Sequence, residues 1–65
     1  MTETLLSMKD VRGRVSLSRQ EIYRRIKAGT FPEQIQLSPA RVAWVGSEVE
    51  EWIQNAIEQG RRKKA

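Results

Sequence analysis

The chain has 65 residues and contains neither cysteine nor histidine, which excludes a disulfide framework, a zinc finger and a catalytic Cys or His. Twelve Lys and Arg residues against eight Asp and Glu residues give a net charge of +4, which points to nucleic acid first and a membrane surface second. Apolar stretches are too short for a membrane span, and residues 1–7 lack a signal-peptide pattern. Charge alone does not choose between these two partners. We therefore expect a cytoplasmic protein with one domain over 1–65, an ordered core over about 5–59, and no metal, cofactor or membrane span.

The starts of three helices are predicted by a Ser-x-x-acid pattern that occurs at Ser7 and Asp10, at Ser18 and Glu21, and at Ser47 and Glu50. In this capping arrangement the serine oxygen accepts a backbone N–H of the first turn, and the acidic side chain reaches back and complements the helix dipole. The sequence therefore predicts three helices, each beginning directly after one of these serines.

The first two predicted helices are short. The first runs from about Met8 to Gly13, which weakens or ends it, and Val15-Ser16-Leu17 then forms a turn with two apolar anchors. The second runs from Arg19 to about Ala28, where Gly29 closes it and Pro32 prevents its continuation. Its buried stripe consists of Ile22 and Ile26, which are four residues apart.

The third predicted helix runs from Glu48 to about Gln59 and is closed by Gly60. Its apolar residues follow the helical period and predict a complete amphipathic stripe, made of Val49, Trp52, Ile53, Ala56 and Ile57. Trp52 and the earlier Trp44 are interpreted as core residues rather than stacking platforms, because so small a domain needs large side chains. Residues 60–65 form a basic tail.

The region between the second and third helices has the pattern of a β-hairpin. Polar and apolar residues alternate over 34–37, residues 42–45 are rich in strand formers, and residues 38–41 are typical of a turn. The order helix, turn, helix, hairpin, helix predicts a mainly α fold with a small β-hairpin: a winged helix-turn-helix of three helices plus a wing.

The net charge is distributed unevenly along the chain. Residues 18–28 carry four basic side chains against Glu21, residues 48–59 carry four glutamates, and residues 60–65 carry four basic side chains. The helix from Arg19 to Ala28 is therefore the basic element of the domain, and we expect the acidic third helix to face away from a polyanion.

Side chains of the helix from Arg19 to Ala28 suit a DNA major groove, which admits one α-helix. Gln20 can pair with adenine, and Arg19 or Arg24 can form two hydrogen bonds with guanine. Lys27 suits a phosphate contact that positions the domain without reading sequence. Ser18 can cap the helix and also contact the DNA backbone.

Several candidates have a second interpretation. Tyr23 either contacts DNA or covers the edge of the core, and Arg25 either contacts a phosphate or forms an ion pair with Glu21. Arg41 in the wing either reaches a minor groove or phosphate, or is solvated. The tail either contacts the DNA backbone, or serves solubility, or has no role, and its basic residues are Arg61, Arg62, Lys63 and Lys64.

Two stretches of the sequence resemble the AlpA-type prophage regulators. The first comprises Leu17-Ser18-Arg19, Ile22-Tyr23-Arg24, Ile26-Lys27-Ala28-Gly29 and Phe31-Pro32. The second comprises Val42-Ala43-Trp44, Ser47-Glu48-Val49 and Trp52-Ile53. The resemblance spans Leu17 to Ile53 and implies a MerR-like winged helix-turn-helix that binds DNA, with Ser18, Arg19, Tyr23, Arg24 and Lys27 on the recognition helix and Arg41 in the wing.

The sequence departs from the family pattern at two places. Lys9-Asp10 and Arg12-Gly13-Arg14 stand where leucines are common, which bears on the length of the first helix. Gln20-Glu21 stands where small hydroxyl residues are common, at the end of the helix that would read bases, so the base preference is open.

These observations predict a sequence-specific, double-stranded DNA-binding protein of prophage or mobile-element origin that regulates transcription, for example of an integrase gene. An excisionase-type directionality factor that binds attachment-site DNA is the first alternative. An adapter that docks on an integrase is the second, from a different class. We expect no enzyme, because nothing places a nucleophile beside a base. The protein would associate with the nucleoid and have no membrane partner. We also expect additional copies of it as partners on DNA, since a single module buries a limited interface.

Overall fold

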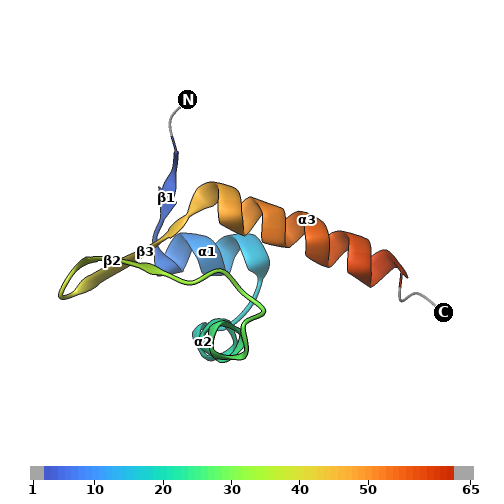
Figure 1. Ribbon diagram of the computed structural model, residues 1–65, viewed down its shortest axis with the longest axis horizontal. Helices are drawn as coiled ribbons and strands as arrows, with labels where there is room; N and C mark the ends of the chain where they lie inside the picture. Colours follow the sequence, from blue (N-terminus) through green and yellow to red (C-terminus); the bar gives the residue numbers. More distant parts are fainter. Residues whose placement is uncertain (1–2, 63–65) are drawn as a thin grey trace.

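The computed structural model describes residues 3–62, which form three helices and a three-stranded antiparallel sheet arranged as a winged helix-turn-helix (Figure 1). The elements in chain order are β1 (Leu5–Leu6), α1 (Met8–Val15), α2 (Arg19–Ala28), β2 (Ile35–Ser38), β3 (Arg41–Val45) and α3 (Gly46–Arg62). The predicted mainly α fold class with a β wing is confirmed. Strand β1 was not predicted from the sequence.

The first two helices begin as predicted, each with a complete capping box. Ser7 Oγ accepts the Asp10 N–H at 3.1 Å, and Ser18 Oγ accepts the Glu21 N–H at 3.1 Å. The predicted bounds of α2 are confirmed, and the helix ends at Gly29, whose φ of 80° lies in the left-handed region. Local signals therefore define both ends of α2.

The predicted end of α1 at Gly13 is wrong, because the helix continues to Val15 and ends at Ser16, which has a φ of 59°. A glycine inside a helix costs about 1 kcal/mol relative to alanine. Val15 lies half-buried against the core, and burying a valine contributes about 1.5 kcal/mol or more when complete. The packing of Val15 offsets much of the cost of the glycine and favours a helix that continues past it, and Val15 and Leu17 both act as the predicted apolar anchors.

The predicted start of α3 after Ser47 is also wrong, because the helix begins at Gly46. The Ser47 N–H and Oγ–H donate to the Glu3 carboxylate at 3.1 and 2.9 Å. The Gly46 N–H donates to the Thr4 carbonyl at 2.6 Å. Glu3 and Thr4, which directly precede β1, therefore cap the start of α3 from another part of the chain.

The predicted end of α3 before Gly60 is wrong as well, since the helix continues to Arg62. Arg62 Nη2 lies 3.5 Å from Glu58 Oε2, one turn earlier, and basic side chains in the last turn complement the helix dipole. Arg61 and Arg62 thus belong to a helix rather than a tail, whereas Lys63 and Lys64 lie outside the described residues.

The sheet has the order β1-β3-β2, with β3 in the centre. Leu5 pairs with Val45 in one ladder, and Ile35 pairs with Ala43 in the other. The hairpin is confirmed, but its turn is shorter than predicted, because Ser38 and Arg41 pair as the last and first residues of β2 and β3.

The core lies where the sheet meets the three helices. Its buried residues come from all three helices, from β1 and β3, and from the segment after α2, and they are Leu6, Val11, Ile22, Phe31, Ala43, Trp44 and Val49. Trp44 Nε1 donates to the Pro32 carbonyl at 3.0 Å, and Trp52 Nε1 donates to the Thr30 carbonyl at 2.7 Å. Trp44 is therefore a core residue as predicted, and the half-buried Trp52 packs against the same core.

The predicted stripe of α3 is buried only over its first half. Val49 is buried and Ile53 is half-buried, but Ala56 and Ile57 are exposed. The second half of α3 extends beyond the rest of the molecule, so no other element covers these two residues (Figure 1).

Candidate nucleic-acid interface

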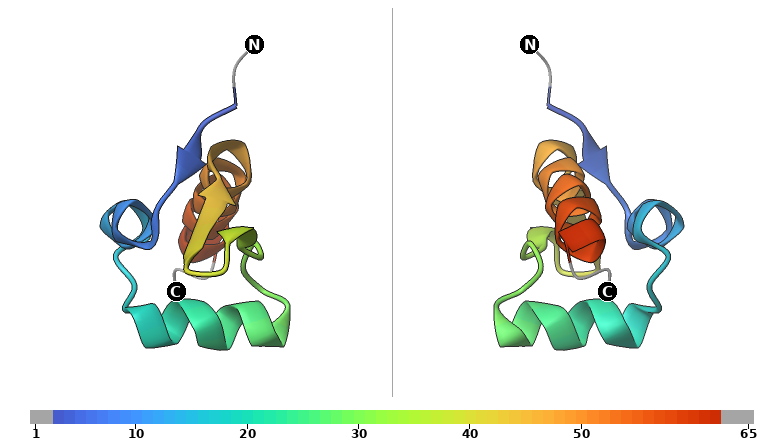
Figure 2. Two further views of the ribbon diagram at one scale, coloured as in Figure 1. Left: turned by 90° about the vertical axis from the view of Figure 1, so that its left-hand side faces the viewer. Right: turned by 90° about the vertical axis from the view of Figure 1, so that its right-hand side faces the viewer.

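Helix α2 forms one edge of the molecule. In both views of Figure 2 it lies across the domain, and no other element covers its outer side. Ile22 is completely buried and Ile26 is half-buried, so the inward face of the helix is fixed by the core. Helical periodicity places Gln20, Arg24 and Lys27 opposite the two isoleucines, on the outward face of α2, whereas Arg19 and Arg25 lie nearer its core-facing side. All five side chains are exposed to solvent.

The four cations of α2 form no ion pair with any residue that the structure describes. Within residues 3–62, Arg62 with Glu58 is the one pair of opposite charges closer than 4.0 Å. The Arg25–Glu21 ion pair, one of the two interpretations of Arg25, is therefore not formed. The positive charges on this edge remain available to an external anion.

Glu21, the acidic residue of α2, is held at the start of the helix. Its carboxylate accepts the Ser18 N–H at 3.1 Å. Hydrogen bonds from Ser18, together with the nearby charges of Arg25 and Arg24, lower the pKa of Glu21 below its usual value. The Glu21 carboxylate is therefore part of the capping box of α2. Ser18 Oγ accepts the Glu21 N–H in the same capping box, and the Ser18 side chain is still exposed to solvent.

Tyr23 lies at the edge of the core. Its ring is half-buried, and its centroid lies 6.5 Å from that of Trp44 at a tilt of 54°. The interpretation of Tyr23 as a residue that covers the core edge is thus confirmed, and the half-exposed ring still borders the outer face of α2.

The remaining predicted residues lie on elements other than α2. Arg41 is exposed at the tip of the β2–β3 hairpin, directly after the turn. Arg61 and Arg62 are exposed in the last turn of α3, which extends away from the hairpin (Figure 1). The structure therefore brings together the predicted residues of α2, and it places Arg41 separately on the hairpin. Near the end of α3, Gln59 and Gly60 line an open pocket together with Arg25 of α2.

Two basic residues of α1 border this edge and were missed by the sequence analysis. Lys9 and Arg12 are exposed and line an open depression, together with Ser16 and Ser18, where α1 leads into α2. They are three residues apart and so lie on one side of α1. That spacing is the signal that could have identified them.

Acidic side chains of α3 lie away from the outer face of α2. In Figure 2, α3 lies on the inner side of α2, across the core. Glu48 and Glu51 line a groove between α3 and the segment that follows α2, and Glu50 lies beside Glu3 and Ser47. The basic edge and the acidic helix are therefore separate surfaces.

The described part of the chain has no group of three acidic side chains that could hold a metal ion. Among residues 3–62, no helix is both long and apolar enough to span a membrane. The side chains exposed along α2 are cations and a carboxamide, which are groups that bind anions and base edges.

Comparison with known proteins gives two findings. Residues 4–57 match the family described as "Prophage CP4-57 regulatory protein (AlpA)". The chain is also similar to the uncharacterized protein ORF88 of enterobacteria phage P4, with 39% identity over 61 residues that cover 94% of this chain and 68% of the phage protein. The match includes β1, both leading helices, the hairpin and most of α3.

Proposed function

This chain belongs to the AlpA family of prophage regulatory proteins, and we propose that it regulates transcription by sequence-specific binding to double-stranded DNA, for example near an integrase gene. The observation that carries the proposal is helix α2 itself, because no other element covers its outer side, and four cations that are unpaired within residues 3–62 are exposed along it with one carboxamide. An α-helix presented in this way fits a major groove.

In the proposed complex, α2 enters the major groove with its first turns toward the bases. Arg19 and Arg24 each have the planar donor fork that pairs with guanine, and Gln20 has the donor and acceptor that pair with adenine. Lys27 and Arg25, nearer the end of the helix, bind phosphates and orient the domain. Ser18, and the exposed side of Tyr23, contact the DNA backbone beside them.

Flanking elements add phosphate contacts in this proposal. Lys9 and Arg12 of α1 lie next to the start of α2 and contact the DNA strand that borders the groove. Arg41 at the hairpin tip reaches the adjacent backbone or minor groove. Arg61 and Arg62 extend along α3 and add further charge for phosphates. The activity is binding, without a catalytic step.

Selection of bound duplexes from a random pool tests the proposal. We expect one enriched sequence motif, and an affinity whose logarithm falls with the logarithm of salt concentration at a slope of about −4.5 if about five phosphates are engaged. No enrichment together with a flat salt response would contradict it. A cluster of genomic sites inside an attachment region, rather than beside a promoter, would instead favour excision.

Two substitutions distinguish a residue that reads a base from a residue that positions the domain on phosphates. Arg24→Ala should weaken binding by about 1–3 kcal/mol and relax specificity at one base position. Lys27→Ala should weaken all sequences alike and reduce the salt slope by about one unit. Arg14→Ala is a matched control, because Arg14 is exposed on α1 beside Glu3 and Ser47 rather than beside α2. Unchanged gel shifts for both α2 variants would exclude α2 as the reading helix.

A further inference from the structure

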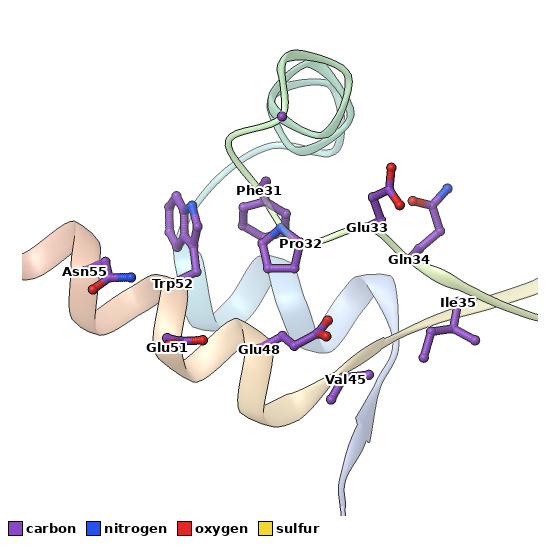
Figure 3. Close-up of a pocket in the computed structure, with 11 residues that line it drawn as sticks. Phe31, Pro32, Glu33, Gln34, Ile35, Val45, Glu48, Glu51, Trp52 and Asn55 are labelled. Atoms are coloured by element: carbon purple, nitrogen blue, oxygen red, sulfur yellow. The ribbon is translucent and has the colours of Figure 1, made fainter.

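A groove lies between α3 and the segment that connects α2 to β2, away from the outer face of α2 (Figure 3). Its volume is about 600 Å³. Phe31, Pro32 and Trp52 provide its apolar lining, and Ile35 borders it with 39% of its surface exposed. The domain therefore has a second recessed surface that the proposed DNA contacts do not use.

Three carboxylates surround this groove. Glu33 comes from the segment after α2, and Glu48 and Glu51 come from the first half of α3. Glu33, Glu48 and Glu51 have no cation within 4.0 Å among residues 3–62. An apolar floor with unpaired carboxylates at its rim is complementary to a segment that carries an apolar side chain next to basic ones.

The aromatic rings in the groove are already held in place. Trp52 is fixed by its hydrogen bond to the Thr30 carbonyl, and its ring meets Phe31 edge to face with centroids 4.9 Å apart. Figure 3 shows the side chains of Trp52, Phe31 and Pro32 between α3 and α2. A guanidinium group that stacks on a fixed indole ring loses little entropy and gains a cation–π interaction.

The second half of α3 has the complementary character. Every residue from 54 to 62 is exposed, Ile57 has 45% of its surface in solvent, and Arg61 follows one turn later. Residues 58–62 carry Arg61 and Arg62 against Glu58, and Lys63 and Lys64 follow in the sequence, so residues 58–64 have a net charge of +3, opposite in sign to the three carboxylates of the groove. An apolar residue beside basic ones is what the groove fits.

This helix end cannot reach the groove of its own chain. Helical periodicity places Ile57 on the side of α3 opposite Glu48. The helix also extends away from the hairpin and from its own first turns (Figure 1), where Glu48 and Glu51 line the groove. We therefore propose that the groove of one copy binds the α3 end of a second copy, with Ile57 against the apolar floor and Arg61 between Glu51 and the ring of Trp52.

The proposed contact joins two different surfaces, so it is head to tail and leaves one groove and one helix end free for further copies. A single helix end in a groove buries far less than the about 1,200 Å² of stable interfaces. We therefore expect a weak association that appears only toward millimolar concentration. This self-association is a property beyond the proposed DNA binding, and it is measured without DNA. Failure of the self-association proposal and failure of the DNA-binding proposal can therefore be told apart.

The test follows amide and indole signals of the complete ¹⁵N-labelled chain by NMR as its concentration is raised from micromolar to millimolar. We expect concentration-dependent shifts at the Trp52 indole and at Ile57 and Arg61. Glu51→Lys and Arg61→Glu should each weaken the association about tenfold or more, because each places like charges together. A mixture of the two variants should restore it, since the opposite charges then meet across copies.

Glu50→Lys is the matched control, because it makes the same charge change on the same helix outside the groove. It should leave the shifts unchanged, and circular dichroism should show that every variant is folded. A chain that stays monomeric to millimolar concentration would overturn the proposal. So would an equal loss of association in the Glu50→Lys variant, or Arg61→Glu leaving the shifts intact, which would assign the groove to another cationic segment or protein.

Discussion

Glu3 performs the capping role that the sequence pattern had assigned to Ser47. Its carboxylate accepts both the backbone N–H and the hydroxyl of Ser47, and it does so from the other end of the chain. These two bonds, together with one from the Thr4 N–H, stabilise the charged form and lower the pKa of Glu3 below its usual 4.5. A single exposed side chain thus links the N-terminal segment to the start of α3.

This bonding predicts how stability depends on pH. Because the folded-state pKa of Glu3 is lowered, its contribution is present above the unfolded-state pKa of 4.5 and is lost as the pH falls through the folded-state value. Glu3→Gln should therefore lower the melting temperature at neutral pH and reduce the further loss on acidification to about pH 3. The measurement is a series of thermal melts by circular dichroism.

Glu33→Gln is the control for this series, because no hydrogen bond to the Glu33 side chain is formed within residues 3–62. Glu21 contributes in the same direction in both variants, so some acid sensitivity should remain. If Glu3→Gln and Glu33→Gln give the same melting curve at every pH, the Glu3–Ser47 contact does not stabilise the fold.

Among the helices and strands, some glycines are required by the backbone geometry and others are not. Gly29 ends α2 in a left-handed conformation, and a Cβ at Gly46 would lie 2.9 Å from the Thr4 carbonyl oxygen. Gly13 has helical geometry and open space around it. Glycine is therefore needed at the end of α2 and where β1 meets α3, but not inside α1.

Substituting alanine at two of these positions should shift stability in opposite directions. Gly13→Ala should raise the free energy of unfolding by about 0.5–1 kcal/mol, because alanine is the better helix former. Gly29→Ala should lower it by about 1–2 kcal/mol, because a Cβ is strained in the left-handed region. Urea titrations followed by the circular dichroism of the helices measure the free energy of unfolding of both variants. A stabilised Gly29→Ala variant would show that α2 can end another way.

At the scale of the whole molecule, a small core supports two projecting parts. The molecule measures 45 × 31 × 19 Å, with the hairpin and the second half of α3 extending in different directions (Figure 1). The two-residue strand β1 places Leu6 in the core, where 5% of its surface is exposed, while the preceding Leu5 keeps 49% exposed. The shortest element therefore contributes to the packing of the entire domain.

The adjacent leucines of β1 form a matched pair for testing this contribution. Leu6→Ala should lower the free energy of unfolding by about 2–4 kcal/mol, because it leaves a cavity in the core. That is a large part of the about 3–10 kcal/mol expected for a chain of this size. Leu5→Ala should change it by less than about 1 kcal/mol. Denaturation with urea gives both values, and equal effects would contradict the observed packing.

The sequence alone determined the features that depend on neighbouring residues. The capping boxes at Ser7 and Ser18, the end of α2 at Gly29, and the pairing of two strands through a short turn all involve groups a few residues apart. For the same reason the helical period correctly separated the buried Ile22 from the exposed cations of α2, which are the candidate DNA-binding residues.

Tertiary structure decided what depends on residues far apart in the chain. The start of α3 depends on Glu3 and Thr4, and the length of α1 depends on Val15 meeting the core. The exposure of Ile57 and the acidic groove around Trp52 follow from where α3 extends past its neighbours. Periodicity shows which residues share a side of a helix, but burial of that side requires another element opposite it, and only the folded chain supplies one.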